Sequence, residues 1–323
     1  MEDSLGGSGG ERAGQSILSG VSFGVGTWAW GDRLFWGYGS GYAQDEVRQA
    51  FDASLEAGIR LFDTAEVYGQ GQSEILLGEF IRAVREQAPN EQLLVATKFM
   101  PFPWRLSRAS LMRALRGSLR RLGLSKVDLY QIHQPLPPVN VETWMAGLVE
   151  AMQAGLTRAV GVSNYDVTRT QRSYDALIRE GIQLASNQVE YSLLNRKIEK
   201  DGLMKLCQDL KITIIAYSPL AMGVLTGKYT AENPPKGVRG GRYNKRLLQR
   251  ITPLVQLLRK TGAAHEGKTP AQVALNWVIC KGALPIPGAK TLAQAEQNAG
   301  ALGWRLTDEE VAALDAASDA VND

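Results

Sequence analysis

Eight short apolar runs alternate with helical patterns along this chain, and this alternation constrains the fold more than any other feature. One run, with Ile59, Leu61 and Phe62, stays apolar until it stops at Asp63. That pattern is typical of a parallel-sheet strand, which is covered on both faces. Strands are expected over residues 22–27, 59–63, 93–98, 127–133, 159–162, 184–189, 212–217 and 284–287.

Helical periodicity fills the segments between these runs. Ser73 is the expected N-cap of the second helix, and Gly58, Gly123 and Gly155 end three others. A Gly- and Pro-rich loop is expected over residues 221–243. Helices are expected over residues 45–57, 73–87, 107–122, 141–153, 166–179, 197–210 and 247–260, from residue 270 onward, near residue 294, and over residues 308–317.

Strand and helix alternate eight times with no change of composition between the halves. This order predicts a (β/α)8 TIM barrel with extra C-terminal helices, as one domain over residues 17–323 after a disordered tail over residues 1–16. A doubly wound open sheet is the alternative fold. It would need fewer strands or a domain boundary, and a Gly-x-Gly-x-x-Gly turn between a strand and a helix, and the chain shows none of these.

Composition excludes several classes of function. The net charge is +3, and no long basic run offers a footprint for nucleic acid. No apolar run approaches the roughly 20 residues of a membrane span. Cys207 and Cys280 lie far apart in helical patterns, so we expect two buried thiols in a reducing compartment. The chain has only two histidines, which excludes a histidine-rich metal site. We expect a cytoplasmic protein and leave a plastid location open.

Polar side chains end most of the expected strands. The carboxyl ends of barrel strands surround one mouth, so these side chains are expected to converge there. Capping and turn formation explain one or two such residues but not a series. The series consists of Asp63, Lys98, His133, Ser163, Asn164, Gln188, Tyr217 and Ser218, with Tyr68 in the loop beyond Asp63.

Four of these residues form a coherent proton-donating group. A tyrosine hydroxyl has a pKa near ~10, and a neighbouring lysine cation lowers it by favouring the phenolate. Lys98 would therefore lower the pKa of Tyr68, and Asp63 would hold Lys98 in position and keep it protonated. His133 would hydrogen-bond a carbonyl and orient it toward the tyrosine proton. Such a group can protonate a carbonyl during its reduction, but the hydride must come from a cofactor.

Four longer segments resemble the signatures of the aldo-keto reductase superfamily. They cover residues 62–69, 128–133, 160–164 and 286–290, in the family's order, and the resemblance extends from Gly20 onward. It implies Asp63, Tyr68, Lys98 and His133 as the catalytic tetrad. It also implies an extended nicotinamide cofactor that is bound without a Rossmann fold.

The same resemblance implies the cofactor contacts. Ser163, Asn164 and Gln188 would hold the nicotinamide carboxamide, and Tyr217 would stack on the ring. The pyrophosphate would lie along the segment after Tyr217. The remaining implied contacts are Thr27, Trp28, Ser218, Pro219, Leu220, Gly223, the segment from Leu225 to Lys228, Gly288, Lys290, Gln294 and Asn298.

Lys290 favours NADP over NAD, because a cation near the ribose 2′ position suits a phosphate. Many family members have an arginine for that phosphate where this chain has Gln294. Arg239 or Arg242, in the long loop, could supply the missing charge.

Four tryptophans follow the first and third strands: Trp28, Trp30, Trp36 and Trp104. They are interpreted as walls of an aromatic substrate pocket, with packing in the core as the alternative. Tyr130 and Tyr191 are expected to be packing residues, and His265 is expected to lie in a surface loop.

The sequence thus predicts NADPH-dependent reduction of aldehydes or ketones by a monomer that acts on a small-molecule carbonyl substrate. Tyr68 would act as the general acid, and no metal is expected. A nucleotide-sensing regulatory module with weak reductase activity is the alternative, since the resemblance extends to potassium-channel β-subunits. A barrel isomerase without a cofactor is a third possibility. The sequence does not specify a particular substrate.

Overall fold

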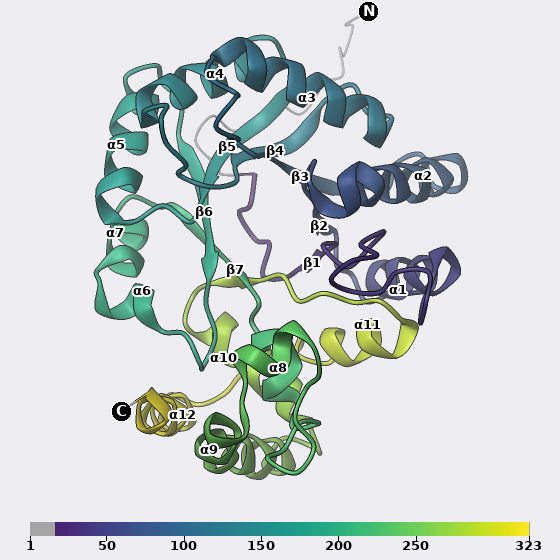
Figure 1. Cartoon of the computed structure of the whole chain (residues 1–323), viewed down its shortest axis with the longest axis vertical. Coiled ribbons are helices and arrows are strands. Elements are labelled where there is room, and N and C mark those ends of the chain that lie inside the picture. The colour runs from purple at the N-terminus through teal and green to yellow at the C-terminus, as the bar shows by residue number, and fades with distance from the viewer. Residues whose placement is uncertain (1–16, 323) are drawn as a thin grey trace, which may run out of the picture.

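Eight parallel strands form a ring in the order in which they occur along the chain (Figure 1). The structure, a computed structural model, describes residues 17–322. The expected tail over residues 1–16 lies outside the described residues. The strands are β1 (Gly24–Gly26), β2 (Leu61–Asp63), β3 (Leu94–Phe99), β4 (Val127–Ile132), β5 (Thr157–Ser163), β6 (Leu184–Glu190), β7 (Thr213–Tyr217) and β8 (Leu284–Pro285).

The first and last strands meet through a glycine. Gly26 forms an isolated parallel bridge with Gly288, and its amide donates to the Pro287 carbonyl at 3.1 Å. A Cβ atom on Gly26 would lie 2.8 Å from the Ile286 carbonyl oxygen, so a side chain here would push the two ends of the sheet apart. This contact completes the ring, and the predicted (β/α)8 barrel is confirmed.

Helices surround the ring, and further helices pack beside it near the C-terminus, where α11 lies against α1 and α12 against α9 (Figure 1). In chain order they are α1 (Gln44–Glu56), α2 (Gln72–Gln87), α3 (Arg108–Leu122), α4 (Val141–Gln153), α5 (Val167–Ile178), α6 (Lys197–Lys200), α7 (Leu203–Asp209), α8 (Val238–Arg242), α9 (Lys245–Ala264), α10 (Pro270–Cys280), α11 (Leu292–Ala299) and α12 (Asp308–Asn322).

Strand alternation sorts side chains between two apolar layers. In β2, Leu61 belongs to the cluster inside the barrel, whereas Phe62 belongs to the larger cluster between the strands and the helices. Asp63 is two residues beyond Leu61 and therefore points inward again. The same parity places Lys98 inside the barrel above Ala96. The barrel floor is apolar, and the polar groups gather above it.

Several local expectations were wrong at their boundaries. The helix expected over residues 197–210 is two helices, α6 and α7, separated at Gly202, whose φ is 87°. The expected loop over residues 221–243 contains a 3-10 turn, η2 (Ala221–Thr226), and α8. The last strand ends at Pro285 instead of residue 287.

Ser73 is not an N-cap, because helix α2 is preceded by Gly71 with φ 94° and Ser73 lies within the helix. Its hydroxyl instead lies 2.7 Å from that of Thr27 and 2.9 Å from that of Thr64.

Cys207 is buried as expected, but Cys280 is only partly buried. Its position in the last turn of α10 leaves the thiol near the surface, where it contacts the Asn276 side chain.

Candidate active site

A buried ion pair lies at the upper end of the barrel interior. Lys98 and Asp63 have side chains that are 0% and 2% exposed. The Lys98 Nζ donates to Asp63 Oδ1 and, at 2.8 Å, to the carbonyl of Thr64. Burial is the largest single influence and would lower the pKa of the ammonium, but the charges of Asp63 and Tyr68 and the hydrogen bonds to both together outweigh it, so the pKa of Lys98 is raised. Lys98 is therefore a fixed cation.

The other oxygen of Asp63 is held by two amides. Oδ2 accepts from Gln188 Nε2 at 2.9 Å and from Gln131 Nε2 at 3.2 Å. Gln131 in turn accepts from the Ser186 hydroxyl at 3.3 Å. Sequence reasoning missed Gln131, although it lies two residues before His133 and so shares its inward parity. Both carboxylate oxygens are thus occupied, which fixes the orientation of Asp63.

Tyr68 brings its hydroxyl to the same cation. It begins the 3-10 turn η1 (Tyr68–Gly71), and its hydroxyl oxygen lies 3.2 Å from Lys98 Nζ. The sequence predicted that Lys98 lowers the pKa of this phenol. The lysine charge acts in that direction, but burial has the larger effect and the pKa of Tyr68 is raised. Tyr68 therefore keeps its proton at neutral pH, as a proton donor must.

His133 lies directly beyond β4 and against Tyr68. The two rings meet edge to face, with centroids 5.7 Å apart. Burial, together with the nearby Lys98 charge, lowers the pKa of His133 to about 3. The imidazole is therefore neutral at physiological pH and has one N–H donor. Its Nδ1 has no hydrogen-bond partner among the described residues.

The residues expected to hold a nicotinamide carboxamide lie beside this group and are bonded to one another. Asn164 Nδ2 donates to the His133 carbonyl at 3.1 Å and to Ser163 Oγ at 2.9 Å. Its Oδ1 accepts from the Tyr217 hydroxyl at 2.9 Å. Gln188 was expected to hold the carboxamide, but in the structure its amide nitrogen donates a hydrogen bond to Asp63. The ends of β5, β6 and β7 thus join the site.

The segment after β7 turns sharply along the rim. Ser218 and Met222 have φ values of 51° and 55°, and Gly223 has a φ of 92°. A Cβ on Gly223 would lie 3.2 Å from Lys228 Cε, so the segment folds onto that lysine. The Leu225 side chain is fully buried in the outer core, so a contact of Leu225 with a cofactor would have to come from its backbone.

Three cations gather at the far end of the expected cofactor site. Arg239 and Lys290 both lie 5.5 Å from the centroid of the Trp36 ring. Burial, Arg239 and Lys228 together lower the pKa of Lys290. None of the three pairs with a carboxylate in the part of the chain that the structure describes. Such unpaired, mutually repelling charges suit an anionic ligand.

The structure separates the two arginines proposed to replace the missing one. Arg239 faces Lys290, whereas Arg242 is paired with Glu190. Gln294 cannot act as a cation and is engaged elsewhere, since its Oε1 accepts from the Lys290 amide at 2.9 Å. Asn298 donates to the Gly288 carbonyl at 3.2 Å and so shapes the turn after β8.

The four tryptophans have three different surroundings. Trp30 is fully buried against Phe51, Phe62 and Phe80, so it is a core residue and the pocket interpretation is wrong for it. Trp28 lies 6.2 Å from Tyr68, ring to ring. Trp36 contacts Trp28 but also Lys290.

Trp104 is 73% exposed and stacks on Phe102. Tyr130 and Tyr191 are fully buried packing residues, as expected. His265 lies in the turn after α9, as expected, where its Nε2 lies 2.9 Å from Glu310 and its ring lies on Trp304.

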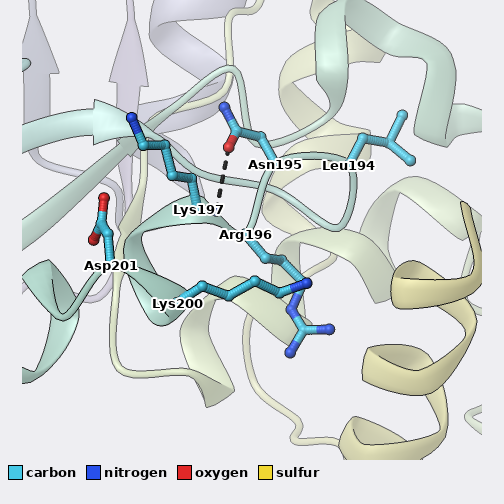
Figure 2. A pocket seen from close by; sticks show the side chains of 6 residues that line it. All are labelled: Leu194, Asn195, Arg196, Lys197, Lys200 and Asp201. Carbon is cyan, nitrogen blue, oxygen red and sulfur yellow. Dashed lines mark hydrogen bonds between the residues drawn. The ribbon is translucent and has the colours of Figure 1, made fainter. Parts of the chain in front are cut away.

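A surface hollow of about 400 Å³ lies beside α6 and contains none of the expected site residues (Figure 2). Arg196 on its edge is paired with Glu199 and Asp319, so it offers no free charge. The hollow is lined by Leu194, Asn195, Arg196, Lys197, Lys200 and Asp201. Within residues 17–322, no three His, Cys, Asp or Glu side chains cluster in a way that could hold a metal ion, and no helix is long and apolar enough to cross a membrane.

The fold and these side chains define a barrel enzyme with a buried Asp63–Lys98 pair and the partly buried Tyr68 and His133 at its mouth. The model of the Aldo/keto reductase family matches residues 22–319. The chain therefore belongs to the aldo/keto reductase family, and the predictions of that family and of an oxidoreductase are confirmed.

Three relatives illustrate the similarity. The chain is 42% identical to pyridoxal reductase, chloroplastic, of Arabidopsis thaliana, over 93% of this chain and 84% of that protein. It is 40% identical to an uncharacterized oxidoreductase of Mycobacterium tuberculosis, over 90% and 87% of the two chains. The crystal structure of an aldo-keto reductase from Klebsiella pneumoniae in complex with NADPH is 31% identical, covers 91% of this chain and 90% of its own, and has a TM-score of 0.71.

Proposed function

We propose that this protein is an NADPH-dependent reductase that converts aldehydes or ketones to alcohols. The observation that carries the proposal is the position of the Tyr68 hydroxyl, 3.2 Å from the buried cation of Lys98 and beside a neutral His133. A protonated phenol, a fixed positive charge and an imidazole whose Nδ1 has no partner among residues 17–322 are suited to protonating a carbonyl oxygen as it becomes an alkoxide.

The residues present fit a phosphate-bearing dinucleotide. Lys228, Arg239 and Lys290 offer unpaired charge for its phosphates, and Lys290 and Arg239 suit the 2′-phosphate that distinguishes NADPH from NADH. The mutually bonded Ser163 and Asn164 side chains lie near His133, where a carboxamide would find donors and acceptors. When bound, NADPH supplies the hydride. The NADPH complex of the Klebsiella pneumoniae relative supports this choice of cofactor.

The chain's own residues handle the proton. Tyr68 retains its proton because burial raises the pKa of the phenol, and it gives that proton up when the carbonyl oxygen gains negative charge. Lys98 then stabilises the phenolate that remains, which is the direction in which its charge acts. Asp63 keeps Lys98 charged, and His133 donates a hydrogen bond that orients the carbonyl.

Pyridoxal is the first substrate to test. The Arabidopsis thaliana relative is named a pyridoxal reductase and is 42% identical over 93% of this chain. Pyridoxal is a planar aromatic aldehyde, and Trp28 offers an aromatic face 6.2 Å from Tyr68. We therefore propose pyridoxal reduction to pyridoxine as the leading activity.

The deciding experiment compares the Tyr68→Phe variant with the wild-type protein. NADPH oxidation with pyridoxal and with a panel of simple aldehydes should fall at least a hundredfold in the variant, because one general acid contributes about 10²–10⁴-fold. NADPH affinity, measured by quenching of tryptophan fluorescence, should stay within about twofold. Near wild-type turnover by Tyr68→Phe would refute the assignment of the acid.

The same assays separate the alternatives. A nucleotide-sensing module would bind NADPH tightly but turn over no aldehyde of the panel at a steady rate. A cofactor-free isomerase would show neither fluorescence quenching nor a rise in melting temperature with NADPH. We further propose a single domain over residues 17–323, a monomer by size-exclusion chromatography, and a cytoplasmic location, with a plastid as the alternative suggested by the chloroplastic relative.

A further inference from the structure

One partly exposed ion pair connects the loop that carries Tyr68 to the segment after β3. The Glu66 side chain is 7% exposed and that of Arg105 is 25% exposed. Glu66 Oε1 accepts from Arg105 Nη1 and, at 2.8 Å, from the amide of Met100. Arg105 Nη1 also donates to the Met100 carbonyl at 3.0 Å. Glu66 thus closes the segment of residues 100–105 against the Tyr68 loop.

Arg105 lies against two aromatic rings, the fully buried Phe99 and the partly buried Phe102. Its guanidinium carbon is 5.2 Å from the centroid of Phe99 and 5.3 Å from that of Phe102. Phe102 stacks on Trp104 with centroids 4.7 Å apart and planes 6° apart. Trp104 is 73% exposed, so the stack presents a flat face to solvent with the arginine at its back.

A second aromatic stack lies on the other side of the Tyr68 loop. Trp28 and Phe35, which follow β1, stack with centroids 4.9 Å apart, and Trp28 is next to Tyr68. The strand order places β1 and β3 on either side of β2 (Figure 1). The loop that delivers Tyr68 therefore emerges between two stacked pairs of rings. A planar aromatic aldehyde can meet flat apolar faces on both sides.

We propose that the Glu66–Arg105 ion pair determines substrate specificity, because it holds the Phe102–Trp104 stack beside the Tyr68 loop and neutralises the cation behind that stack. The site then takes uncharged planar aromatic aldehydes in preference to aldehydes that bear a carboxylate or a phosphate. This inference rests on the proposed reductase function and adds a charge preference that the tetrad does not set.

The physical reason is electrostatic. An unpaired arginine at the back of an aromatic wall would attract an anionic substrate through its charge, which acts over several ångströms in a site partly shielded from water. Glu66 is almost fully buried against this arginine and cancels that charge. Neither Glu66 nor Arg105 touches the reacting atoms, so both are positioning residues.

The test uses two aldehydes that differ in one charge, benzaldehyde and 4-carboxybenzaldehyde. The measured quantity is the ratio of kcat/KM for the anionic aldehyde to that for the neutral one. In Glu66→Gln, which keeps an acceptor for the Met100 amide, this ratio should rise about tenfold, as one unpaired charge roughly 8 Å away would produce at an effective dielectric constant of about 30. In Arg105→Met the ratio should fall below the wild-type value, because Glu66 is then unpaired.

Two further variants isolate the charge from the packing. The double variant Glu66→Gln/Arg105→Met has no unpaired charge at this position, so its kcat/KM ratio should return to within about twofold of wild type. Its KM for benzaldehyde should rise relative to its KM for propanal, because the Phe102–Trp104 stack is no longer held in place. Arg105→Lys keeps the charge pair and should leave the ratio unchanged. The control is Glu142→Gln, which breaks an ion pair with Arg172 whose side chains are both 49% exposed, and it should change neither the ratio nor the KM.

The same comparison is made with dissociation constants: the affinities of the NADP⁺ complex for the anionic and the neutral aldehyde are measured by tryptophan fluorescence. The charge preference is then tested even if the protein shows no turnover. If Glu66→Gln and Arg105→Met move the ratio in the same direction, or leave it unchanged, the specificity role is refuted while the reductase function stands. If the wild-type protein reduces no aldehyde but binds the neutral one more tightly, the proposed function fails and the charge preference survives.

Discussion

Replacing Asp63 with asparagine tests whether Lys98 is a buried cation that depends on one carboxylate. The Lys98 side chain is fully buried, and its ammonium donates to Asp63 and to the Thr64 carbonyl. In Asp63→Asn the ammonium keeps the carbonyl but loses its counterion. Removing one partner of a buried pair costs about 3–5 kcal/mol, or on the order of 4–7 °C in melting temperature for a chain of this size.

The dependence on pH gives this prediction a signature. In the wild-type protein the pKa of Lys98 is raised, so its contribution to stability is present below the ordinary lysine pKa and is lost as the pH rises through the folded value. In Asp63→Asn no carboxylate opposes burial, which is the largest single influence, and the pKa of Lys98 should fall although Tyr68 still acts to raise it. The unfolded variant then binds more protons than the folded one, and its stability increases as the pH rises. The difference in the free energy of unfolding between the wild-type protein and Asp63→Asn should therefore decrease from pH 7 to pH 10.

The assay is urea unfolding, followed by circular dichroism without NADPH, at several pH values. The double variant Asp63→Asn/Lys98→Met removes the stranded charge and should be more stable than Asp63→Asn alone, by at least about 1 kcal/mol. The matched control is Asp209→Asn, which breaks an exposed pair with Lys205 and should cost less than about 1 kcal/mol. The reasoning would be refuted if Asp63→Asn lost less than about 1 kcal/mol of unfolding free energy, or if its difference from the wild-type protein increased with pH.

Three further outcomes are expected. Replacing Lys290 or Arg239 with methionine should weaken NADPH binding about 10–100-fold and leave NADH binding within about twofold, as titration by fluorescence would show. Because the pKa of His133 is about 3, kcat/KM should show no histidine titration near pH 6.5. Below the ordinary histidine pKa, the unfolded state binds a proton on His133 and the folded state does not. The free energy of unfolding should therefore decrease from about pH 6.5 toward pH 3, and this decrease should be smaller in His133→Asn. Gly26→Ala should destabilise the protein by about 1–3 kcal/mol in urea unfolding, since its Cβ would lie 2.8 Å from the Ile286 carbonyl oxygen.

The order of strands and helices was readable from the sequence because periodicity is a local property. Leu61, Phe62 and Asp63 alternate between the inner and outer layers as strand geometry requires. Expected boundaries failed where a single backbone angle decided them, as at Gly202, or where short helical turns lay within a Gly- and Pro-rich loop. Periodicity carries no information about such isolated positions.

The convergence of Asp63, Tyr68, Lys98 and His133 was also predictable, because a barrel brings strand ends to one mouth. What these groups do to one another was not. The sequence suggested that the Tyr68 pKa falls beside Lys98, and only the structure shows that burial outweighs the cation. The fraction of a side chain that is buried depends on the whole fold.

By itself, then, the sequence determined the barrel, the residue types at its mouth and the family. The tertiary structure decided which amides hold Asp63, which tryptophan is core and which arginine faces Lys290. Gln188 reaches Asp63 across 125 residues of sequence, and Arg105 reaches Glu66 across 39. Contacts between such distant segments depend on the closure of the ring and on the packing of its loops, and no local pattern in the chain records either.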